Sequence, residues 1–122
     1  MATLVDQEYR ARLAALGAKF AATVPGTLDK IRRALADCEA GASPDAVQLD
    51  VLHALLHGVA GSAGTFGYGE FGRQCRRLEQ RLRVVIAAQL LPVPEWRQIA
   101  QEVRQLLAWA DIDPLAPWPH AD

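Results

Sequence analysis

Apolar residues recur at three- and four-residue intervals along most of the chain, which is the spacing that gives a helix one buried face. Residues that favour strands are sparse and never alternate for long. We therefore predict an all-α fold with five helices. Their apolar positions are, in chain order, Leu13, Leu16 and Phe20; Leu28, Ile31, Leu35 and Cys38; Leu49, Leu52, Leu55, Leu56, Val59 and Ala63; Phe71, Cys75, Leu78, Leu82 and Val85; and Ile99, Val103, Leu106 and Leu107.

Proline and serine mark where the first three predicted helices meet. The first helix runs over about residues 5–22, and Pro25 separates it from the second, for which Thr23 is the expected N-cap. Ser43 is the expected N-cap of the third helix, with Pro44 in its first turn. Because these connections are short, neighbouring helices should pack antiparallel in a bundle.

The pattern predicts one helical domain over residues 1–112. A Pro-Val-Pro segment at 92–94 separates the fourth helix from the fifth. The segment 113–122 contains three prolines, so we expect it to be an extended or disordered tail.

The composition argues against several classes of function. The chain of 122 residues has 13 basic and 14 acidic side chains and a net charge of −1, so it lacks the basic excess that binds nucleic acid. No apolar run approaches the ~18 residues of a membrane span, and the N-terminus does not resemble a signal peptide. Cys38 and Cys75 fit reduced, semi-buried thiols. We expect a cytoplasmic protein that stands alone.

The most unusual segment follows His57, where glycines stand at positions 58, 61, 64 and 67. A glycine inside a helix costs about 1 kcal/mol relative to alanine. Several such residues within two turns therefore need a reason. One reason is a bare helix surface, on which another protein can approach a reactive side chain closely.

A helical projection places His57 outside the apolar stripe. With Leu49 at zero and a turn of about 100° per residue, the apolar residues centre near 300° and His57 falls near 80°. No serine, cysteine or aspartate is spaced to form a hydrolase site with it. An accessible imidazole is itself a nucleophile near neutral pH, and it could accept a phosphoryl group. Four small residues fall between about 60° and 180°: Ala54, Gly58, Gly61 and Gly64.

The segment 57–67 resembles the signature of histidine-containing phosphotransfer (Hpt) domains. In that family an apolar residue follows the phosphoacceptor histidine by two positions, a glycine by four, and a second glycine by ten, with small residues between. A Leu-Glu pair that follows a cysteine on the next helix also matches, and the resemblance covers about residues 5–110. The matching residues are His57, Val59, Gly61, Ser62, Ala63, Gly67, Cys75, Leu78 and Glu79.

The resemblance implies an antiparallel four-helix bundle with an additional N-terminal helix, and a phosphocarrier rather than an enzyme. His57 would accept a phosphoryl group from a receiver-domain aspartate or a histidine kinase. It would pass the group to a response-regulator receiver in a multistep phosphorelay. The receiver would supply Mg²⁺, and the chain itself, a monomer, would need no cofactor and no metal. The approach surface would comprise Ala54, Gly58, Ala60, Gly61 and Gly64.

Ala60 departs from the family pattern, in which a lysine commonly stands three residues after the histidine and helps to hold the phosphoryl group. Projection of the fourth helix places Arg76, Glu79 and Arg83 on one flank of its apolar stripe. If that flank faces His57, either arginine would replace the lysine and Glu79 would hydrogen-bond near the imidazole. The competing interpretation is that these are ordinary solvated charges.

Three other functions remain open. A docking module that binds a kinase or receiver without phosphate chemistry is favoured by Ala60 but not by the retained His57. A metal site could use His53, His57 and His120, but it lacks further ligands and the glutamate of a zinc-protease motif. His53 is more simply a boundary residue of the core. An autonomous enzyme would need paired acidic residues, which are scattered here as Asp45, Asp50, Glu70 and Glu79.

Overall fold

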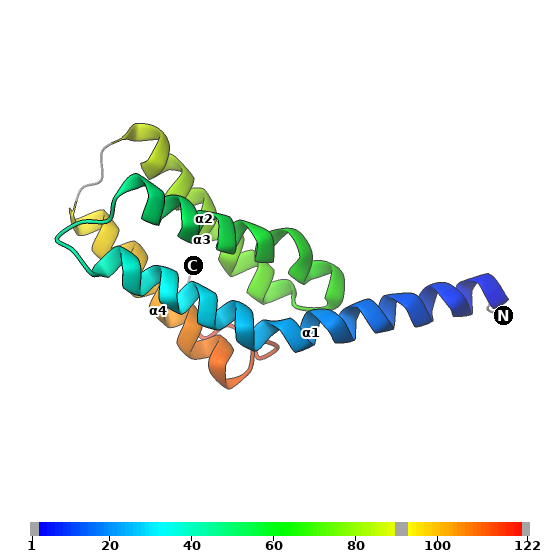
Figure 1. Cartoon of the computed structure of the whole chain (residues 1–122). Coiled ribbons are helices and arrows are strands. Elements are labelled where there is room, and N and C mark those ends of the chain that lie inside the picture. The colour runs from blue at the N-terminus through cyan, green and yellow to red at the C-terminus, as the bar shows by residue number, and fades with distance from the viewer. Residues whose placement is uncertain (1–2, 90–92, 121–122) are drawn as a thin grey trace.

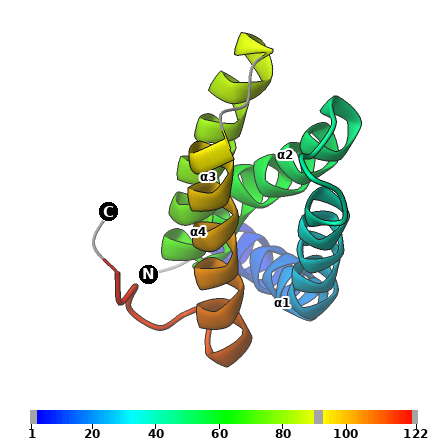
Figure 2. The ribbon, with the colours of Figure 1, turned by 90° about the vertical axis from the view of Figure 1, so that its left-hand side faces the viewer.

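The computed structural model describes residues 3–89 and 93–120. Its regular elements are all helical, so the predicted all-α class is confirmed. Figures 1 and 2 show α2, α3, α4 and the C-terminal half of α1 packed as a bundle. No helix in these described ranges is long and apolar enough to cross a membrane. The elements are α1 (Leu4–Glu39), α2 (Ala46–Ser62), the 3-10 helix η1 (Ala63–Phe66), α3 (Gly69–Ala88) and α4 (Val93–Ile112).

Helix α1 is one continuous helix of 36 residues, so the prediction of two helices separated at Pro25 is wrong. Pro25 lies inside the helix, where it lacks the N–H of a normal helical hydrogen bond and crowds the preceding turn. The helix changes direction in this light-blue region (Figure 1). Thr23 is not an N-cap, because its hydroxyl donates to the Phe20 carbonyl at 2.7 Å.

Packing on both sides of Pro25 explains why α1 continues through it. Before the proline, Phe20 stacks on Phe66 with ring centroids 5.4 Å apart, and it packs at a tilt against Tyr68 with centroids 5.1 Å apart. After it, Leu28 is buried in the core. These tertiary contacts outweigh the local cost of an interior proline, about 3 kcal/mol. The N-terminal part of α1 therefore takes the place of the separate additional helix that we expected.

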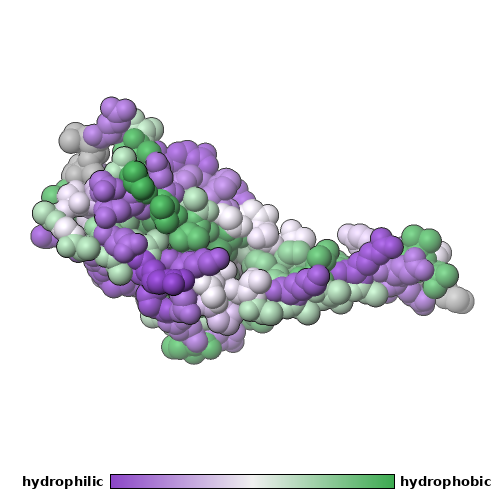
Figure 3. Space-filling view, viewed as in Figure 1, coloured by the Kyte–Doolittle hydropathy of each residue, from purple (hydrophilic) through white to green (hydrophobic). Residues whose placement is uncertain are grey.

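The N-terminal arm of α1, residues 4–16, projects beyond the bundle (Figure 1). No other α-helix of the described residues runs beside this arm, so its apolar side chains are exposed. They form green patches along the arm in Figure 3. Of the stripe predicted for the first helix, Phe20 alone packs against the core. The large exposed apolar residues of the arm are Leu4, Val5, Tyr9, Leu13 and Leu16.

Helix α2 begins with a capping box. The Asp45 carboxylate accepts from the Gln48 N–H at 2.8 Å, and the Gln48 side chain accepts from the Asp45 N–H at 2.9 Å. The predicted start, with Ser43 as N-cap and Pro44 in the first turn, is wrong by two residues. Ser43 has alanine three positions later, so it cannot form the reciprocal pair of bonds that Asp45 forms.

The turn from α2 to α3 brings these two helices side by side. Gly67 adopts a φ of 87°, a left-handed conformation that favours glycine, and the Tyr68 N–H then donates to the Ala63 carbonyl at 2.9 Å. At the crossing, a methyl group on Gly72 would lie 3.2 Å from the Ala63 side chain. Glycine at this position therefore allows α3 to approach α2 closely.

The core lies between the four α-helices, and apolar burial is its main source of stability. Ion pairs join α4 to its neighbours: Arg104 to Glu39 of α1 at 2.7 Å, and Glu102 to Arg77 of α3 at 2.8 Å. Such partly exposed pairs each contribute at most about 1 kcal/mol. The largest fully buried apolar side chains are Phe71, Ile31, Leu52, Leu56, Leu78, Leu82, Ile99 and Leu106.

Residues 113–120 lie against α4, whereas the sequence led us to expect an extended or disordered tail. The Trp109 indole N–H donates to the Pro117 carbonyl at 3.3 Å, and the Trp109 and Trp118 rings meet edge to face at 5.1 Å. His120 in turn contacts Trp118, with ring centroids 5.0 Å apart. Indole packing therefore anchors a segment whose proline content suggested an open chain. Residues 121–122 lie outside the described residues.

Candidate functional site

His57 lies on the solvent side of α2. Leu52, Leu56 and Val59 of the same helix are buried in the core, and the turn of about 100° per residue directs His57 away from them. Its side chain is 64 % exposed. The backbone of a helix thus holds one end of the ring in place, while the other end is open to solvent.

A buried carboxylate contacts the inner edge of this ring. Glu79 of α3 is 3 % exposed, and its Oε1 lies 3.1 Å from Nδ1 of His57. The same oxygen lies 3.0 Å from Nε2 of His53 and accepts a hydrogen bond from the Arg83 guanidinium. Three nitrogen groups from two helices therefore converge on one carboxylate oxygen.

The protonation state of Glu79 determines which ring nitrogens carry protons. Burial raises the pKa of Glu79, but hydrogen bonds from His57 and Arg83 and the charges of Arg83 and His53 outweigh that effect and hold it below its usual value. At neutral pH the group is an ionised carboxylate, which only accepts hydrogen bonds. His57 must then donate through Nδ1–H and His53 through Nε2–H. In the neutral form of the His57 ring, the lone pair then lies on Nε2, which is what a nucleophile needs.

The surface beside His57 is bare. Ala54, Gly58 and Gly61 are exposed, and a methyl group added at either glycine would meet nothing within 4 Å. Positive φ among the described glycines is confined to Gly67. Neither internal packing nor backbone conformation therefore requires glycine at positions 58 and 61.

The other two residues predicted on the approach surface are placed differently. Ala60 is half-buried against the core. Gly64 is exposed but belongs to η1, because α2 ends at Ser62. A projection that continues the helix through the glycines therefore does not hold beyond Ser62, whose hydroxyl donates to the Gly58 carbonyl at 3.0 Å.

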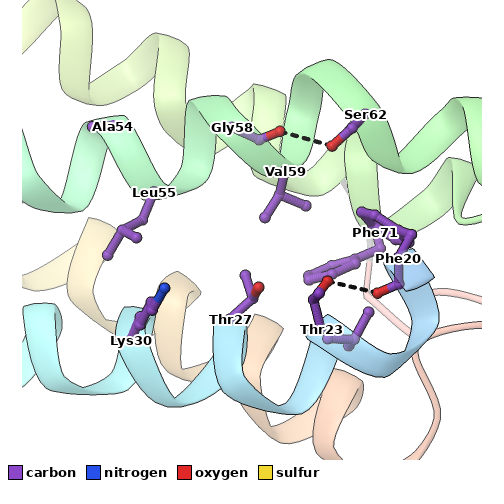
Figure 4. Close-up of a pocket in the computed structure, with 11 residues that line it drawn as sticks. Phe20, Thr23, Thr27, Lys30, Ala54, Leu55, Gly58, Val59, Ser62 and Phe71 are labelled. Carbon is purple, nitrogen blue, oxygen red and sulfur yellow. Dashed lines mark hydrogen bonds between the residues drawn. The ribbon is translucent and has the colours of Figure 1, made fainter. Parts of the chain in front are cut away.

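A hollow of about 270 Å³ opens between α2 and α1 (Figure 4). Gly58 lies at its edge, so the hollow adjoins the bare surface next to His57. Figure 4 shows Thr27 and Lys30 of α1 directed toward α2. The hollow combines an apolar floor with polar side chains along its α1 side. The lining includes Phe20, Thr23, Thr27, Lys30, Leu55 and Val59.

The flank of α3 on which the sequence placed three charged residues does face α2. Glu79 contacts the His57 ring, and Arg83 shares its carboxylate oxygen. Arg76 reaches further along α2 and donates to the Ala60 carbonyl at 3.1 Å. Two guanidinium groups thus lie on the α3 side of the helix that carries His57, where Ala60 supplies no cation of its own.

Outside the cluster of His53, His57 and Glu79, the other groups considered for metal or enzyme chemistry have separate partners. No group of three or more His, Cys, Asp or Glu side chains among the described residues could hold a metal ion. His120 lies against Trp118 in the tail, Asp45 caps α2, and Glu70 pairs with Arg73. Both cysteines are buried, and burial raises the pKa of the Cys38 thiol to about 11.

Sequence reasoning missed the part that His53 has in this cluster. His53 was interpreted as a boundary residue, and its side chain is indeed only 23 % exposed. The available signal was its spacing of four residues from His57, which places both side chains on neighbouring turns of one helix. The carboxylate that accepts from both histidines belongs to Glu79 of α3, so only the tertiary structure could show that they share it.

Comparison with known proteins gives one family. The family model of the Hpt domain matches residues 15–109, which is most of the chain and includes α2, α3 and their connection. No curated protein and no solved structure gives a significant match.

Proposed function

The chain belongs to the Hpt domain family, and from that premise we propose that it is a phosphocarrier with His57 as its phosphoacceptor. His57 receives the phosphoryl group from a receiver-domain aspartate or from a histidine kinase. It then transfers the group to a response-regulator receiver. The chain has no kinase activity of its own in this proposal and acts between two partners of a phosphorelay.

One observation carries the proposal: Nδ1 of His57 is hydrogen-bonded to a buried carboxylate, while Nε2 on this exposed ring has no partner among the described residues. The Glu79 oxygen at 3.1 Å fixes both the tautomer and the orientation of the ring. A nucleophile held in one orientation on a helix loses less entropy on reaching the phosphorus atom than one on a mobile loop.

The chemical step needs little else from this chain. The Nε2 lone pair attacks the phosphorus of an aspartyl phosphate in line with the departing carboxylate oxygen. The N–P bond forms as the O–P bond breaks, and the electron pair of the broken bond stays with the aspartate. The imidazole becomes cationic and keeps its Nδ1 proton, and the Glu79 carboxylate stabilises that charge. Mg²⁺ held by the partner receiver would neutralise charge on the phosphoryl oxygens.

The partner reaches His57 over the bare surface of α2. Ala54, Gly58 and Gly61 leave room for a receiver loop to bring its aspartate close to Nε2. No contact among the described residues requires glycine at 58 or 61. A transient complex of this kind buries a modest area, below about 1,200 Å².

A cation from α3 takes the place of the family lysine that Ala60 lacks. Arg83 lies beside Glu79, and Arg76 lies over the end of α2. Both guanidinium groups are planar donors suited to phosphoryl oxygens. Arg76 is the better candidate of the two, because its present partner is a backbone carbonyl rather than the carboxylate that orients the acceptor.

The test is phosphorylation by purified receiver domains. The protein and its His57→Gln variant are mixed with phosphorylated receivers, and intact mass and acid lability are measured. We expect the wild type to gain an acid-labile phosphate that the variant does not. A folded wild type that gains none from a broad panel of receivers, or a phosphate that persists in His57→Gln, would contradict the proposal.

Ala60 supports a second candidate function, that of a docking module which binds a kinase or receiver without phosphate transfer. In that case the folded protein binds a receiver, measured by calorimetry, and both the wild type and His57→Gln bind equally well. Transfer of phosphate to His57 excludes this candidate.

A further inference from the structure

We propose that His53 is a positioning residue for the phosphoacceptor and acts on His57 through Glu79. The inference rests on the proposed function of His57. It starts from the convergence of both imidazoles on a single oxygen of Glu79, His53 at 3.0 Å and His57 at 3.1 Å.

His53 differs from the other two donors in its burial. The side chains of His57 and Arg83 are 64 % and 60 % exposed, whereas that of His53 is 23 % exposed. Exposed donors exchange their bonds readily with water, but a charge-assisted bond in a less hydrated position is stronger. His53 is therefore the donor that holds the Glu79 oxygen on the α2 side.

The geometry of α2 makes this joint use of Glu79 possible. The His53 and His57 rings are nearly parallel, with an interplanar angle of 16° and centroids 5.9 Å apart. Two residues four positions apart present their rings from successive turns. One carboxylate entering from α3 can then accept from both, and a shift of its oxygen alters the bond to His57.

Arg83 competes with the two histidines for the Glu79 carboxylate. It belongs to the same helix as Glu79, four positions later, and its guanidinium lies at the solvent edge. Without the His53 N–H, the carboxylate can turn toward Arg83 and away from Nδ1 of His57. The His57 ring then loses its fixed tautomer, and part of the population carries its proton on Nε2, where no attack can occur.

His53 does not serve as a second acceptor in this arrangement. Its Nε2 carries the proton that Glu79 accepts, so the nitrogen that faces α3 has no lone pair to offer. The low exposure of the side chain also keeps a receiver aspartate from reaching it.

The first test needs no substitution. Long-range ¹H–¹⁵N spectra of the labelled wild-type protein at neutral pH report the tautomer of each histidine. We expect Nδ1–H for His57 and Nε2–H for His53. A His53 ring in the Nδ1–H form overturns the proposal, whether or not the protein accepts phosphate.

The second test compares two substitutions at the same position. His53→Phe keeps a ring but removes the donor, and His53→Gln keeps an N–H donor of similar reach. We expect His53→Phe to lower the share of Nδ1–H tautomer at His57 and to slow phosphoryl transfer about tenfold, as loss of orientation does. We expect His53→Gln to keep most of the wild-type share of Nδ1–H tautomer at His57 and most of the wild-type transfer rate. His120→Phe, which removes a histidine of the tail, serves as the matched control and leaves both unchanged.

The outcomes separate this proposal from the proposed function. Folded His53→Phe with an unchanged His57 tautomer overturns the positioning role. The positioning role is also overturned if folded His53→Gln shows the same altered tautomer and the same slow transfer as His53→Phe. A wild type with the expected tautomers that never accepts phosphate overturns the proposed function, while the spectra still decide the role of His53.

Discussion

At the scale of single residues, the site is defined by what His57 contacts and by what it does not. Glu79 holds Nδ1 from the interior, and the exposed glycines of α2 leave the outer edge of the ring open. In the proposed function, the chemistry of phosphoryl transfer follows from ordinary imidazole nucleophilicity. Two predictions belong to this scale.

Protonation of Glu79 should destabilise the fold in acid. Because the pKa of this carboxyl is lowered in the folded state, its contribution to stability is present above the unfolded pKa, about 4.3, and is lost as the pH falls through the lower folded value. We expect Glu79→Gln to reduce the free energy of unfolding at pH 7 by about 1–3 kcal/mol. The difference from wild type should shrink below pH ~4.

Chemical denaturation of both proteins across this pH range measures the effect. The comparison isolates Glu79 from Glu102, whose pKa is also lowered because the hydrogen bonds and charges of Arg81 and Arg77 outweigh its burial. A difference between the two proteins that stays constant from pH 7 to pH 3 would contradict the assignment.

A large side chain at Gly58 should block the partner without disturbing the fold. The space over Gly58 is open, so Gly58→Leu should fold with little change in Tm. We expect transfer from a phosphorylated receiver to slow at least tenfold, while labelling of His57 by a small phosphoramidate stays near the wild-type rate. Gly26→Leu is the matched control, since Gly26 is also an exposed helical glycine with open space around it. Equal receiver rates for the two variants would show that partners do not approach over Gly58.

At the scale of elements, local sequence sets the start of α2, whereas tertiary contacts set the continuity of α1. The start of α2 is local, since the Asp45 and Gln48 capping box lies within four residues. The continuity of α1 through Pro25 depends on contacts that Phe20 makes with the turn beyond α2. A proline in a helix is thus tolerated where tertiary packing supports the turns on both sides of it.

Replacement of this proline should stabilise the protein. Pro25→Ala restores a helical N–H and removes a ring that crowds the preceding turn, which should stabilise the folded state by about 3 kcal/mol. It also gives the unfolded chain more conformational entropy, which should offset about 1 kcal/mol of that gain. We expect a net gain of about 1–2 kcal/mol, seen as a higher Tm in thermal unfolding followed by circular dichroism. A lower Tm would mean that the bend itself is needed to seat Phe20 on Phe66.

At the scale of the whole molecule, the family domain and the folded bundle coincide, and the projecting arm is additional. The family match begins at residue 15, close to where α1 leaves the bundle (Figure 1). Ion pairs such as Arg32 with Asp111, 2.6 Å apart, tie α1 to α4 in the bundle region. The arm contributes exposed apolar surface instead of core.

Removal of the arm should leave the bundle intact. A chain that starts at residue 15 loses Leu4, Val5, Tyr9 and Leu13, all of them exposed. We expect its free energy of unfolding to change by less than about 1 kcal/mol, since surface changes away from packed features have small effects. Phosphate acceptance by His57 should persist. Denaturation and phosphorylation assays on both chains check this, and a large loss of stability would show that the arm packs on the bundle in solution.

The sequence by itself determined the helical class and pointed to His57 as the candidate acceptor. These features depend on local or periodic information, namely apolar spacing, turn residues and a histidine followed by glycines at fixed distances. A projection over one helix was enough to place His57 outside the core, because that geometry lies within a single element.

Only the tertiary structure decided the rest. It joined two predicted helices across Pro25, left the large apolar side chains before Phe20 exposed, and packed Trp118 of the tail against Trp109. It also brought Glu79 to His53 and His57 from 26 and 22 residues away. The continuity of α1 and the bridge from Glu79 to both histidines depend on contacts between side chains distant in sequence. The physical reason is that propensity and periodicity describe one element at a time, whereas burial and hydrogen-bond partners are set by how elements meet.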